Sequence, residues 1–154
     1  MKTILMVCLG NICRSPLAEA ILRAKIGDRE IKVDSAGTGD FHIGDRPDKR
    51  ARLVAEKHNI STEGIFCRQF QESDFDNFDE IYAMDPDNYN KLMDLARNNK
   101  DQYKVELILN LLEPGANRGV PDPYYGTEED FERVFELLDK ATDVIIQKYD
   151  SERA

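Results

Sequence analysis

Basic side chains are in the minority in this chain: 21 lysines and arginines stand against 30 aspartates and glutamates, for a net charge of −9. Because nucleic-acid binding depends on clustered positive charge, this balance argues against a nucleic-acid partner. Long apolar runs are also missing, and no stretch approaches the roughly 20 residues that a membrane helix needs. The apolar run that follows Met1 ends by Leu9 without a signal cleavage site. We therefore expect a cytoplasmic protein that does not bind membranes.

Cysteine is scarce as well, with only Cys8, Cys13 and Cys67. Three cysteines are too few, and odd in number, for a disulfide framework. In a reducing compartment these thiols stay free, so each serves either packing or chemistry. We expect Cys67 to serve packing only. No cluster of histidines and cysteines suggests a metal site, and we expect no cofactor.

The pattern of apolar residues predicts alternating strands and helices, without a repeat or a linker that would divide the chain. Four short hydrophobic runs predict strands over residues 3–8, 31–35, 80–84 and 105–109. Apolar residues at three- and four-residue spacing predict helices over 16–26, 47–58 and 86–97. They also predict a C-terminal helix whose buried face contains Phe131, Val134, Phe135, Leu138, Ala141 and Ile145.

Two capping boxes are predicted at helix starts, one from Thr127 and Asp130 and one from Ser73 and Asp76. The alternation of strands and helices is typical of an α/β fold with parallel strands. We expect one domain over residues 1–154, with a four-stranded parallel sheet and helices on both faces. In such sheets, ligands bind beyond the carboxyl ends of the strands.

The stretch VCLGNICRSP, residues 7–16, joins the first predicted strand to the first predicted helix. Backbone N–H groups of such a loop can surround an anion, and the helix N-terminus adds positive potential. Arg14 can grip two phosphate oxygens with its planar guanidinium, and Ser15-Pro16 is typical of a helix start with Ser15 as N-cap. Helix N-termini and nearby arginines promote thiol ionisation. The loop therefore predicts an oxyanion cradle with the Cys8 thiolate as nucleophile at its floor.

Residues 8–16, CLGNICRSP, resemble the active-site loop of the low-molecular-weight protein tyrosine phosphatases. Further segments resemble that family in the same order and spacing over nearly the whole chain: VDSAGT at 33–38, PDKRA at 47–51, AMDPDN at 83–88, PDPYYG at 121–126 and DFERVFELLD at 130–139. Several motifs in register are more specific than one. The chain is identified as a member of that family, with a phosphate-binding loop after the first strand.

The resemblance implies that Cys8 attacks the phosphorus of a phosphate ester and forms a cysteinyl-phosphate intermediate. Arg14 and the backbone amides of the loop would bind the equatorial oxygens, where charge accumulates in the transition state. Ser15 would donate its hydroxyl to the thiolate, a role compatible with an N-cap. Asn11 would hold the shape of the loop, because asparagine tolerates the left-handed backbone conformation. The phosphate-binding loop then comprises Leu9, Gly10, Asn11, Ile12, Cys13 and Ser15.

The departing group needs a proton, and the resemblance assigns this role to Asp122. On sequence alone, Asp122 is an ordinary Asp-Pro turn residue. In the family, the corresponding aspartate is the general acid and then the base for the water that hydrolyses the intermediate. Tyr124 and Tyr125 flank the substrate ring in relatives, although packing in the core is their alternative. With Phe41 as the facing wall, the cleft would favour aryl phosphates and hence tyrosine-phosphorylated proteins.

Two side chains near the loop each have two possible roles. Asp85 resembles the family carboxylate that positions Arg14, and it is equally a candidate N-cap for the helix that begins at Pro86. Cys13 is either a small buried side chain or, as in relatives with this second cysteine, a redox thiol that captures oxidised Cys8 as a disulfide.

Histidine marks the one departure from the family pattern. Many relatives carry a histidine a few residues after the position of His58, in contact with the loop asparagine. Here that segment reads STEGIFCRQF, so the sequence leaves the support of Asn11 open. His42 and His58 themselves we expect to be surface or loop residues.

The sequence leaves three alternatives open. Thioredoxin-coupled arsenate reductases share the loop but need further cysteines for a disulfide relay, and only Cys67 is left. Protein-arginine phosphatases carry threonine at the position of Ile12, so Ile12 favours phosphotyrosine. A non-catalytic phosphotyrosine-binding module or thiol redox sensor is the third, although Cys8, Arg14 and Asp122 are all present. The sequence does not define the oligomeric state.

Overall fold

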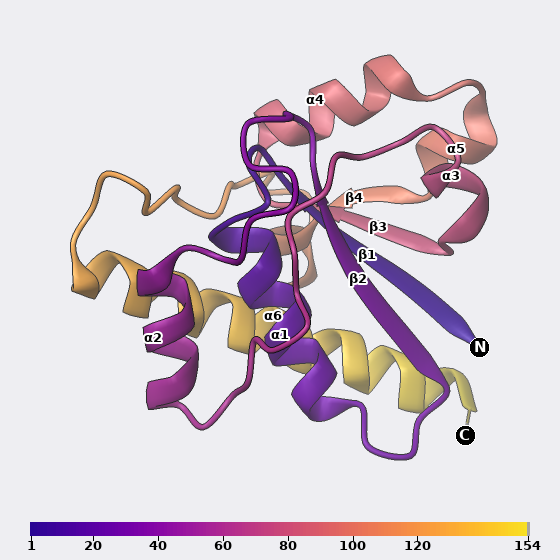
Figure 1. The fold of residues 1–154 in the computed structure, drawn as a ribbon. Coiled ribbons are helices and arrows are strands. Elements are labelled where there is room, and N and C mark those ends of the chain that lie inside the picture. The colour runs from indigo at the N-terminus through magenta and orange to yellow at the C-terminus, as the bar shows by residue number, and fades with distance from the viewer. Residues whose placement is uncertain (154) are drawn as a thin grey trace.

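Four parallel strands form one sheet at the centre of the molecule, in a computed structural model that describes residues 1–153 (Figure 1). The strands lie in the order β2-β1-β3-β4. Their bounds are Lys2–Cys8 for β1, Ile31–Gly37 for β2, Glu80–Ala83 for β3 and Val105–Leu107 for β4. All three pairings are parallel. The predicted fold class, an α/β fold with a four-stranded parallel sheet, is confirmed.

Alternate residues of β1 face opposite sides of the sheet. Ile4 and Met6 belong to the core cluster on one side, whereas Leu5 and Val7 belong to the cluster on the other. All four are at most 1% exposed. Because both faces of the strand are covered, its sequence is a continuous apolar run rather than an alternating one.

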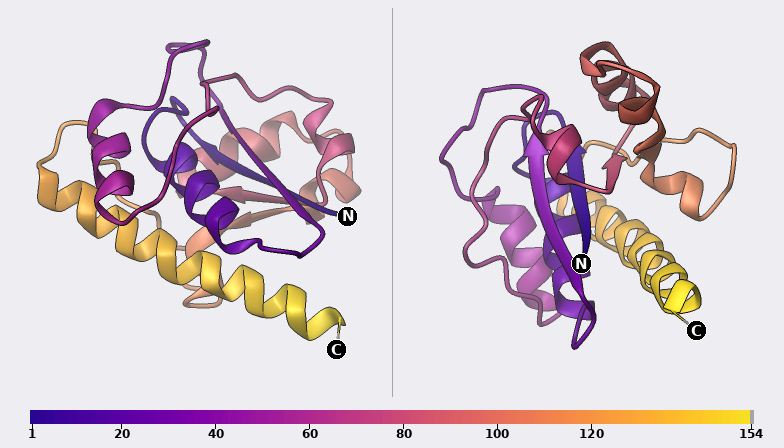
Figure 2. Two further views of the ribbon diagram at one scale, coloured as in Figure 1. Left: turned by 60° about the horizontal axis from the view of Figure 1, so that its bottom comes forward. Right: turned by 90° about the vertical axis from the view of Figure 1, so that its right-hand side faces the viewer.

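Helices cover both faces of the sheet, as expected (Figure 2). On one side lie α1 (Arg14–Lys25), α2 (Lys49–Lys57) and α6 (Glu128–Arg153). On the other lie α3 (Asp74–Asn77) and α4 (Pro86–Leu95), with α5 (Asn99–Tyr103) beside them. None of the helices within residues 1–153 is both long and apolar enough to span a membrane.

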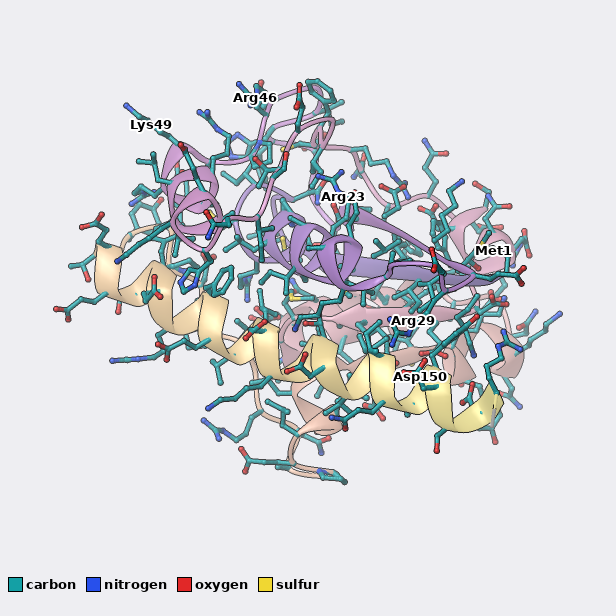
Figure 3. All side chains as sticks on the ribbon, turned by 90° about the horizontal axis from the view of Figure 1, so that it is seen from below. Met1, Arg23, Arg29, Arg46, Lys49 and Asp150 are labelled. Carbon is teal, nitrogen blue, oxygen red and sulfur yellow. The ribbon has the colours of Figure 1, made fainter. Side chains whose placement is uncertain are left out.

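The long helix α6 packs its apolar stripe against α1, and its far end is tied to the loop before β2. Arg29 makes a bidentate pair there with Asp150, at 2.7 and 2.8 Å (Figure 3). On the other side, Arg97 joins α3 to α5 through ion pairs with Asp76 and Asp101.

Several predicted boundaries are wrong by a few residues. β2 continues to Gly37 because Ala36 and Gly37 pair with the last two residues of β1. β4 ends at Leu107, and Ile108–Leu111 forms a 3₁₀ helix, η1, instead of the end of a strand. The short helix α5 lies outside the predicted helices, and it begins where the Asn98 side chain accepts the N–H of Asp101.

Neither predicted capping box forms in full. Ser73 makes no side-chain cap bond, and the turn before α3 is closed by Asp74, whose carboxylate accepts the N–H of Gln71 at 2.8 Å. At α6, Asp130 accepts the N–H of Thr127 at 2.8 Å, which is one half of the box. The Thr127 hydroxyl donates to the same carboxylate at 3.3 Å, so the other half is missing.

The loop that follows β1 lies close to the end of β2. Cys8 is the register partner of Gly37. A Cβ atom at Gly37 would lie 2.7 Å from the backbone oxygen of Leu9 and 3.1 Å from the backbone nitrogen of Asn11. Only glycine therefore allows the loop to approach β2 this closely.

We predict that Gly37→Ala lowers the free energy of unfolding by about 1–3 kcal/mol, because the added methyl group overlaps backbone atoms that cannot rotate away. Urea denaturation measures the loss. Gly10→Ala is the matched control, since its Cβ would meet only side-chain atoms, at 3.4 and 3.6 Å. Equal losses for the two variants would contradict the close approach at Gly37.

Candidate active site

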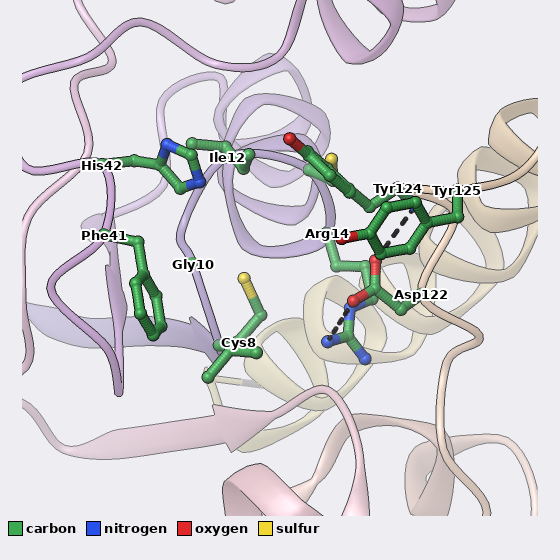
Figure 4. Close-up of a pocket in the computed structure, with 11 residues that line it drawn as sticks. Cys8, Gly10, Ile12, Arg14, Phe41, His42, Asp122, Tyr124 and Tyr125 are labelled. Atoms are coloured by element: carbon green, nitrogen blue, oxygen red, sulfur yellow. Dashed lines mark hydrogen bonds and ion pairs between the residues drawn. The ribbon is translucent and has the colours of Figure 1, made fainter.

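A cleft of about 420 Å³ opens beyond the carboxyl end of β1 (Figure 4). Its position agrees with the rule for ligand sites in parallel sheets. Except for His42, every residue that lines it belongs to the site expected from the sequence. The lining consists of Cys8, Leu9, Gly10, Ile12, Cys13, Arg14, Phe41, His42, Asp122, Tyr124 and Tyr125.

The Cys8 sulfur lies at the floor of this cleft, and Cys8 is only 3% exposed. Its Sγ atom lies 2.9 Å from the hydroxyl oxygen of Ser15 and accepts the backbone N–H of Asn11 at 3.2 Å. Hydrogen bonds donated to sulfur favour the thiolate over the thiol. Two polar groups therefore contact the sulfur at the floor of the cleft.

Asn11 is buried behind the cleft and adopts the left-handed conformation, with φ at 57°. Its Nδ2 atom donates to the hydroxyls of Ser15 at 2.7 Å and Ser35 at 3.0 Å, and its Oδ1 atom accepts the N–H of Arg68 at 2.9 Å. The backbone carbonyl of Asn11 accepts the Cys67 thiol at 2.7 Å. The segment around Arg68 thus supports the loop without a histidine. Cys67 is buried in the core, as expected, and its thiol adds this hydrogen bond to the loop.

The predicted N-cap role of Ser15 is also wrong. Helix α1 begins at Arg14, and its N-cap is Cys13, which makes no side-chain cap bond. Pro16 therefore occupies the third helical position, where the missing N–H costs nothing because the first four N–H groups have no intrahelical partner. The Ser15 hydroxyl is engaged with Cys8 instead, so it serves the site rather than the helix.

Arg14 is held rigidly beside the floor of the cleft, with 3% exposure. Its Nη1 atom donates to Asp85 at 2.6 Å and to the carbonyl of Val120 at 3.0 Å. Asp85 also accepts the N–H of Asn88 at 2.8 Å as N-cap of α4, so one carboxylate fulfils both predicted roles. Burial alone would lower the pKa of Arg14, but the negative charges of Cys8 and Asp85 outweigh it and raise that pKa.

Asp122 reaches the cleft from the loop between η1 and α6, where prolines flank it on both sides. Its Oδ1 atom accepts the N–H of Tyr124 at 3.1 Å, which fixes the turn. Its Oδ2 atom lies 3.7 Å from Nη2 of Arg14, and the side chain is 50% exposed. The carboxyl group is thus in contact with water and only loosely paired.

Aromatic rings stand at the rim of the cleft, Phe41 on one side and Tyr124 and Tyr125 on the other (Figure 4). The two tyrosine rings meet edge to face, with centroids 4.8 Å apart. Phe41 and Tyr125 are 72% and 96% exposed, so neither packs in the core. The guanidinium of Arg50 lies 5.6 Å from the centroid of the Tyr124 ring. Nothing in the sequence alone signals this contact.

Histidine has two different environments. His42 lies in a turn, as expected, but it also lines the cleft, where its ring would meet a Cβ placed on Gly10 at 3.4 Å. Its place next to Phe41 in the sequence is the signal that could have identified it. His58 lies outside the cleft, stacked on Phe135 with ring centroids 3.9 Å apart.

The other two thiols differ from Cys8 in their surroundings. Burial, reinforced by the charges of Asp48 and Cys8, raises the pKa of Cys13 far above that of a free cysteine. Burial also raises the pKa of Cys67 to about 12. Both thiols are therefore protonated at neutral pH.

Within residues 1–153, no group of three or more histidine, cysteine or carboxylate side chains is arranged to hold a metal ion.

Comparison with known proteins gives consistent matches along the chain. The family model described as Low molecular weight phosphotyrosine protein phosphatase matches residues 3–154. The Low molecular weight protein-tyrosine-phosphatase YfkJ of Bacillus subtilis is 40% identical over 157 residues, which cover 99% of each chain. The corresponding enzyme of Gallus gallus, a Low molecular weight phosphotyrosine protein phosphatase, is 40% identical over 152 residues, which cover 96% of this chain and 95% of its own.

Solved structures show the same fold. The crystal structure of Bacillus subtilis YfkJ matches with a TM-score of 0.91 and covers 100% of this chain and 98% of its own. The YwlE arginine phosphatase of Geobacillus stearothermophilus matches with a TM-score of 0.88 at 24% identity, covering 99% and 96%, and shares the fold. The sequence relatives, taken with the cleft, decide the family. The chain belongs to the low molecular weight phosphotyrosine protein phosphatase family, and it is a hydrolase of that class.

Proposed function

We propose that the protein hydrolyses phosphotyrosine in proteins through a cysteinyl-phosphate intermediate. Cys8 is the nucleophile, Arg14 binds phosphate and Asp122 is the general acid and base. One observation carries the proposal: a thiol, a buried guanidinium and a water-accessible carboxyl group line the same cleft beneath aromatic walls. The three free thiols support a place of action in the reducing cytoplasm.

Phosphate binding rests on the loop and on Arg14. The anchors at Asp85 and Val120 fix the plane of the guanidinium before substrate arrives. Together with the backbone N–H groups of residues 9–14, it would hold the equatorial oxygens, where transition-state charge develops. Because these donors are already positioned, little reorganisation is needed during the reaction.

The chemistry takes two steps. As the Cys8 sulfur forms its bond to phosphorus, the bond from phosphorus to the tyrosine oxygen breaks, and Asp122 gives that oxygen its proton. The ionised Asp122 then takes a proton from a water molecule that attacks the intermediate. Inorganic phosphate leaves, and the Cys8 thiolate and the protonated Asp122 are restored.

Ile12 favours tyrosine over arginine as the phosphorylated side chain. It belongs to the loop, lines the cleft and is 9% exposed. Its apolar surface offers contact to an aryl ring and no hydrogen bond to a guanidinium. The arginine phosphatase of Geobacillus stearothermophilus shares the fold alone, so the choice between the two substrates rests on side chains such as this one.

We predict that Cys8→Ser abolishes turnover of p-nitrophenyl phosphate and that Asp122→Asn lowers kcat roughly 10²–10⁴-fold, the usual range for a general acid. The deficit of Asp122→Asn in kcat/KM should be larger with phenyl phosphate, because phenolate is a poorer leaving group than nitrophenolate. Steady-state kinetics on the folded, reduced variants measure both.

Asp40→Asn is the matched control for charge, since Asp40 is exposed on the loop that carries Phe41 and should leave kcat unchanged. No turnover by the folded wild-type protein would overturn the proposed function. An equal deficit of Asp122→Asn in kcat/KM on both esters would overturn the role of Asp122 as acid.

We predict that Ile12→Thr lowers the ratio of kcat/KM for a phosphotyrosine peptide to that for a phosphoarginine peptide by about tenfold, the range that a single pocket contact supplies. Competition between the two peptides measures the ratio directly. Ile43→Thr makes the same chemical change at a residue that is 59% exposed and should leave the ratio as it is. An unchanged ratio in Ile12→Thr would remove Ile12 as the determinant.

We also propose that Cys13, which lines the same cleft as Cys8, protects the nucleophile from oxidation. Peroxide would convert Cys8 to a sulfenic acid, which the Cys13 sulfur would attack to form a disulfide and release water. Because burial raises the pKa of Cys13, this capture should become faster as the pH rises.

We predict that dithiothreitol restores activity to peroxide-treated wild type. It should restore less activity to Cys13→Ser, because the sulfenic acid of that variant oxidises further. The measurement is the recovered fraction after a fixed exposure. Cys67→Ser should recover like the wild type. Full recovery of Cys13→Ser would exclude the protective role.

A further inference from the structure

Glu19 on α1 is a buried acid that the proposed mechanism does not use. It is 7% exposed, and its Oε1 atom accepts the hydroxyl of Ser35 at 2.6 Å. Burial raises the pKa of Glu19 to about 7, against the opposing effect of the Ser35 hydrogen bond and of the charges of Arg23 and Arg68, with Asp34 adding to the rise. A buried carboxyl group is costly, so a role that retains it is of interest.

Glu19 is the far end of a continuous chain of hydrogen bonds that ends at the nucleophile. The bond from Ser35 to Glu19 is followed by one from Asn11 to Ser35 at 3.0 Å, one from Asn11 to Ser15 at 2.7 Å, and the contact between Ser15 and Cys8 at 2.9 Å. All five side chains are buried. Water therefore does not replace any member of the chain.

The orientation of Asn11 decides which way these bonds run. Its Nδ2 atom carries two hydrogens and cannot accept, so both serine oxygens must accept from it. Its Oδ1 atom faces the N–H of Arg68 at 2.9 Å, and a flipped amide would set donor against donor there. Each serine is then left with one proton to donate elsewhere.

The Ser35 hydroxyl donates its hydrogen bond to Glu19, and the Ser15 hydroxyl donates to Cys8. Ser35 donates to the Glu19 carboxyl at 2.6 Å. Ser15 has the Cys8 sulfur at 2.9 Å, while its other acceptor, the carbonyl of Ala36, is 3.5 Å away. Without an acceptor at Glu19, the hydroxyl proton of Ser35 could turn toward Asn11. There it would conflict with the amide hydrogen that Asn11 donates to the Ser35 oxygen.

We propose that Glu19 is a positioning residue for the nucleophile. By accepting the hydrogen bond of Ser35, it helps the N–H of Arg68 to hold the amide of Asn11 and so directs the hydroxyl proton of Ser15 to the Cys8 sulfur. The inference rests on the proposed function, in which Cys8 reacts as a thiolate. Glu19 touches neither substrate nor the reacting atoms and acts only through these three side chains.

Two substitutions separate the acceptor from the charge. Glu19→Gln keeps an oxygen that can accept from Ser35, whereas Glu19→Met has a similar length and no such acceptor. Both remove the carboxylate charge, so their difference reports the acceptor alone. The readout is the rate at which iodoacetamide alkylates Cys8 in the intact enzyme, measured against pH and located by mass spectrometry of the labelled peptide.

For Glu19→Met, we expect the midpoint of the alkylation curve to move up by about one pH unit, because the thiolate loses a donated hydrogen bond. Glu19→Gln should stay within about 0.3 units of the wild type. Ser35→Ala should reproduce the shift of Glu19→Met, and the double variant Glu19→Met/Ser35→Ala should add nothing, since the chain is already broken.

Leu22→Ala controls for lost stability, because Leu22 is fully buried on the same helix and takes no part in the series of hydrogen bonds from Glu19 to Cys8. It should lower the melting temperature and leave the alkylation midpoint where it is. An unshifted midpoint in Glu19→Met, or additive shifts in the double variant, would overturn the positioning role. Alkylation needs no turnover, so a wild-type protein that fails to hydrolyse aryl phosphates would overturn the proposed function separately.

Discussion

The loop that follows β1 depends on one buried asparagine held in a backbone conformation that most residues avoid. Asn11 is completely buried with φ at 57°, and such a left-handed residue costs roughly 1–3 kcal/mol unless its surroundings compensate. Here they do, because its side chain bonds to two serines and the segment at Arg68, and its backbone bonds to Cys8 and Cys67. Helix α1, strand β2 and the segment that precedes α3 therefore meet at a single residue.

Two carboxylates share the charge of Arg14, and their distances give them different tasks. Asp85 is hydrogen bonded at 2.6 Å and is also tied to the start of α4, so it is fixed. Asp122 lies 3.7 Å from the guanidinium and is half exposed, so the attraction between them is screened by water. In the proposed mechanism Asp122 loses and regains a proton during each turnover, and this looser setting suits that role. The fixed partner instead keeps the guanidinium in place.

Much of the site can be predicted from the sequence because its parts follow strand ends. Cys8 ends β1, and Asp85 follows β3, so parallel pairing brings both to one edge of the sheet. Contacts between distant side chains are a different matter. The bond from Cys67 to the loop and the place of Glu19 behind it depend on how segments pack, and no local pattern encodes either one. The N-cap prediction for Ser15 fails for a related reason. Serine before proline is typical of a helix start, but here the hydroxyl contacts the nearby Cys8 sulfur instead.

The anchors of Arg14 have a consequence for how the enzyme is made. Asp85 lies 71 residues from Arg14 along the chain, and Val120 lies 106 residues from it. Contacts of such long sequence separation form late in folding, because long loops must close first. A nascent chain on the ribosome carries the thiol of Cys8 almost from the start of synthesis, yet the guanidinium stays unanchored until nearly the whole chain has emerged. In the proposed mechanism, the nucleophilic sulfur is therefore synthesised well before the contacts that hold the phosphate-binding arginine can form.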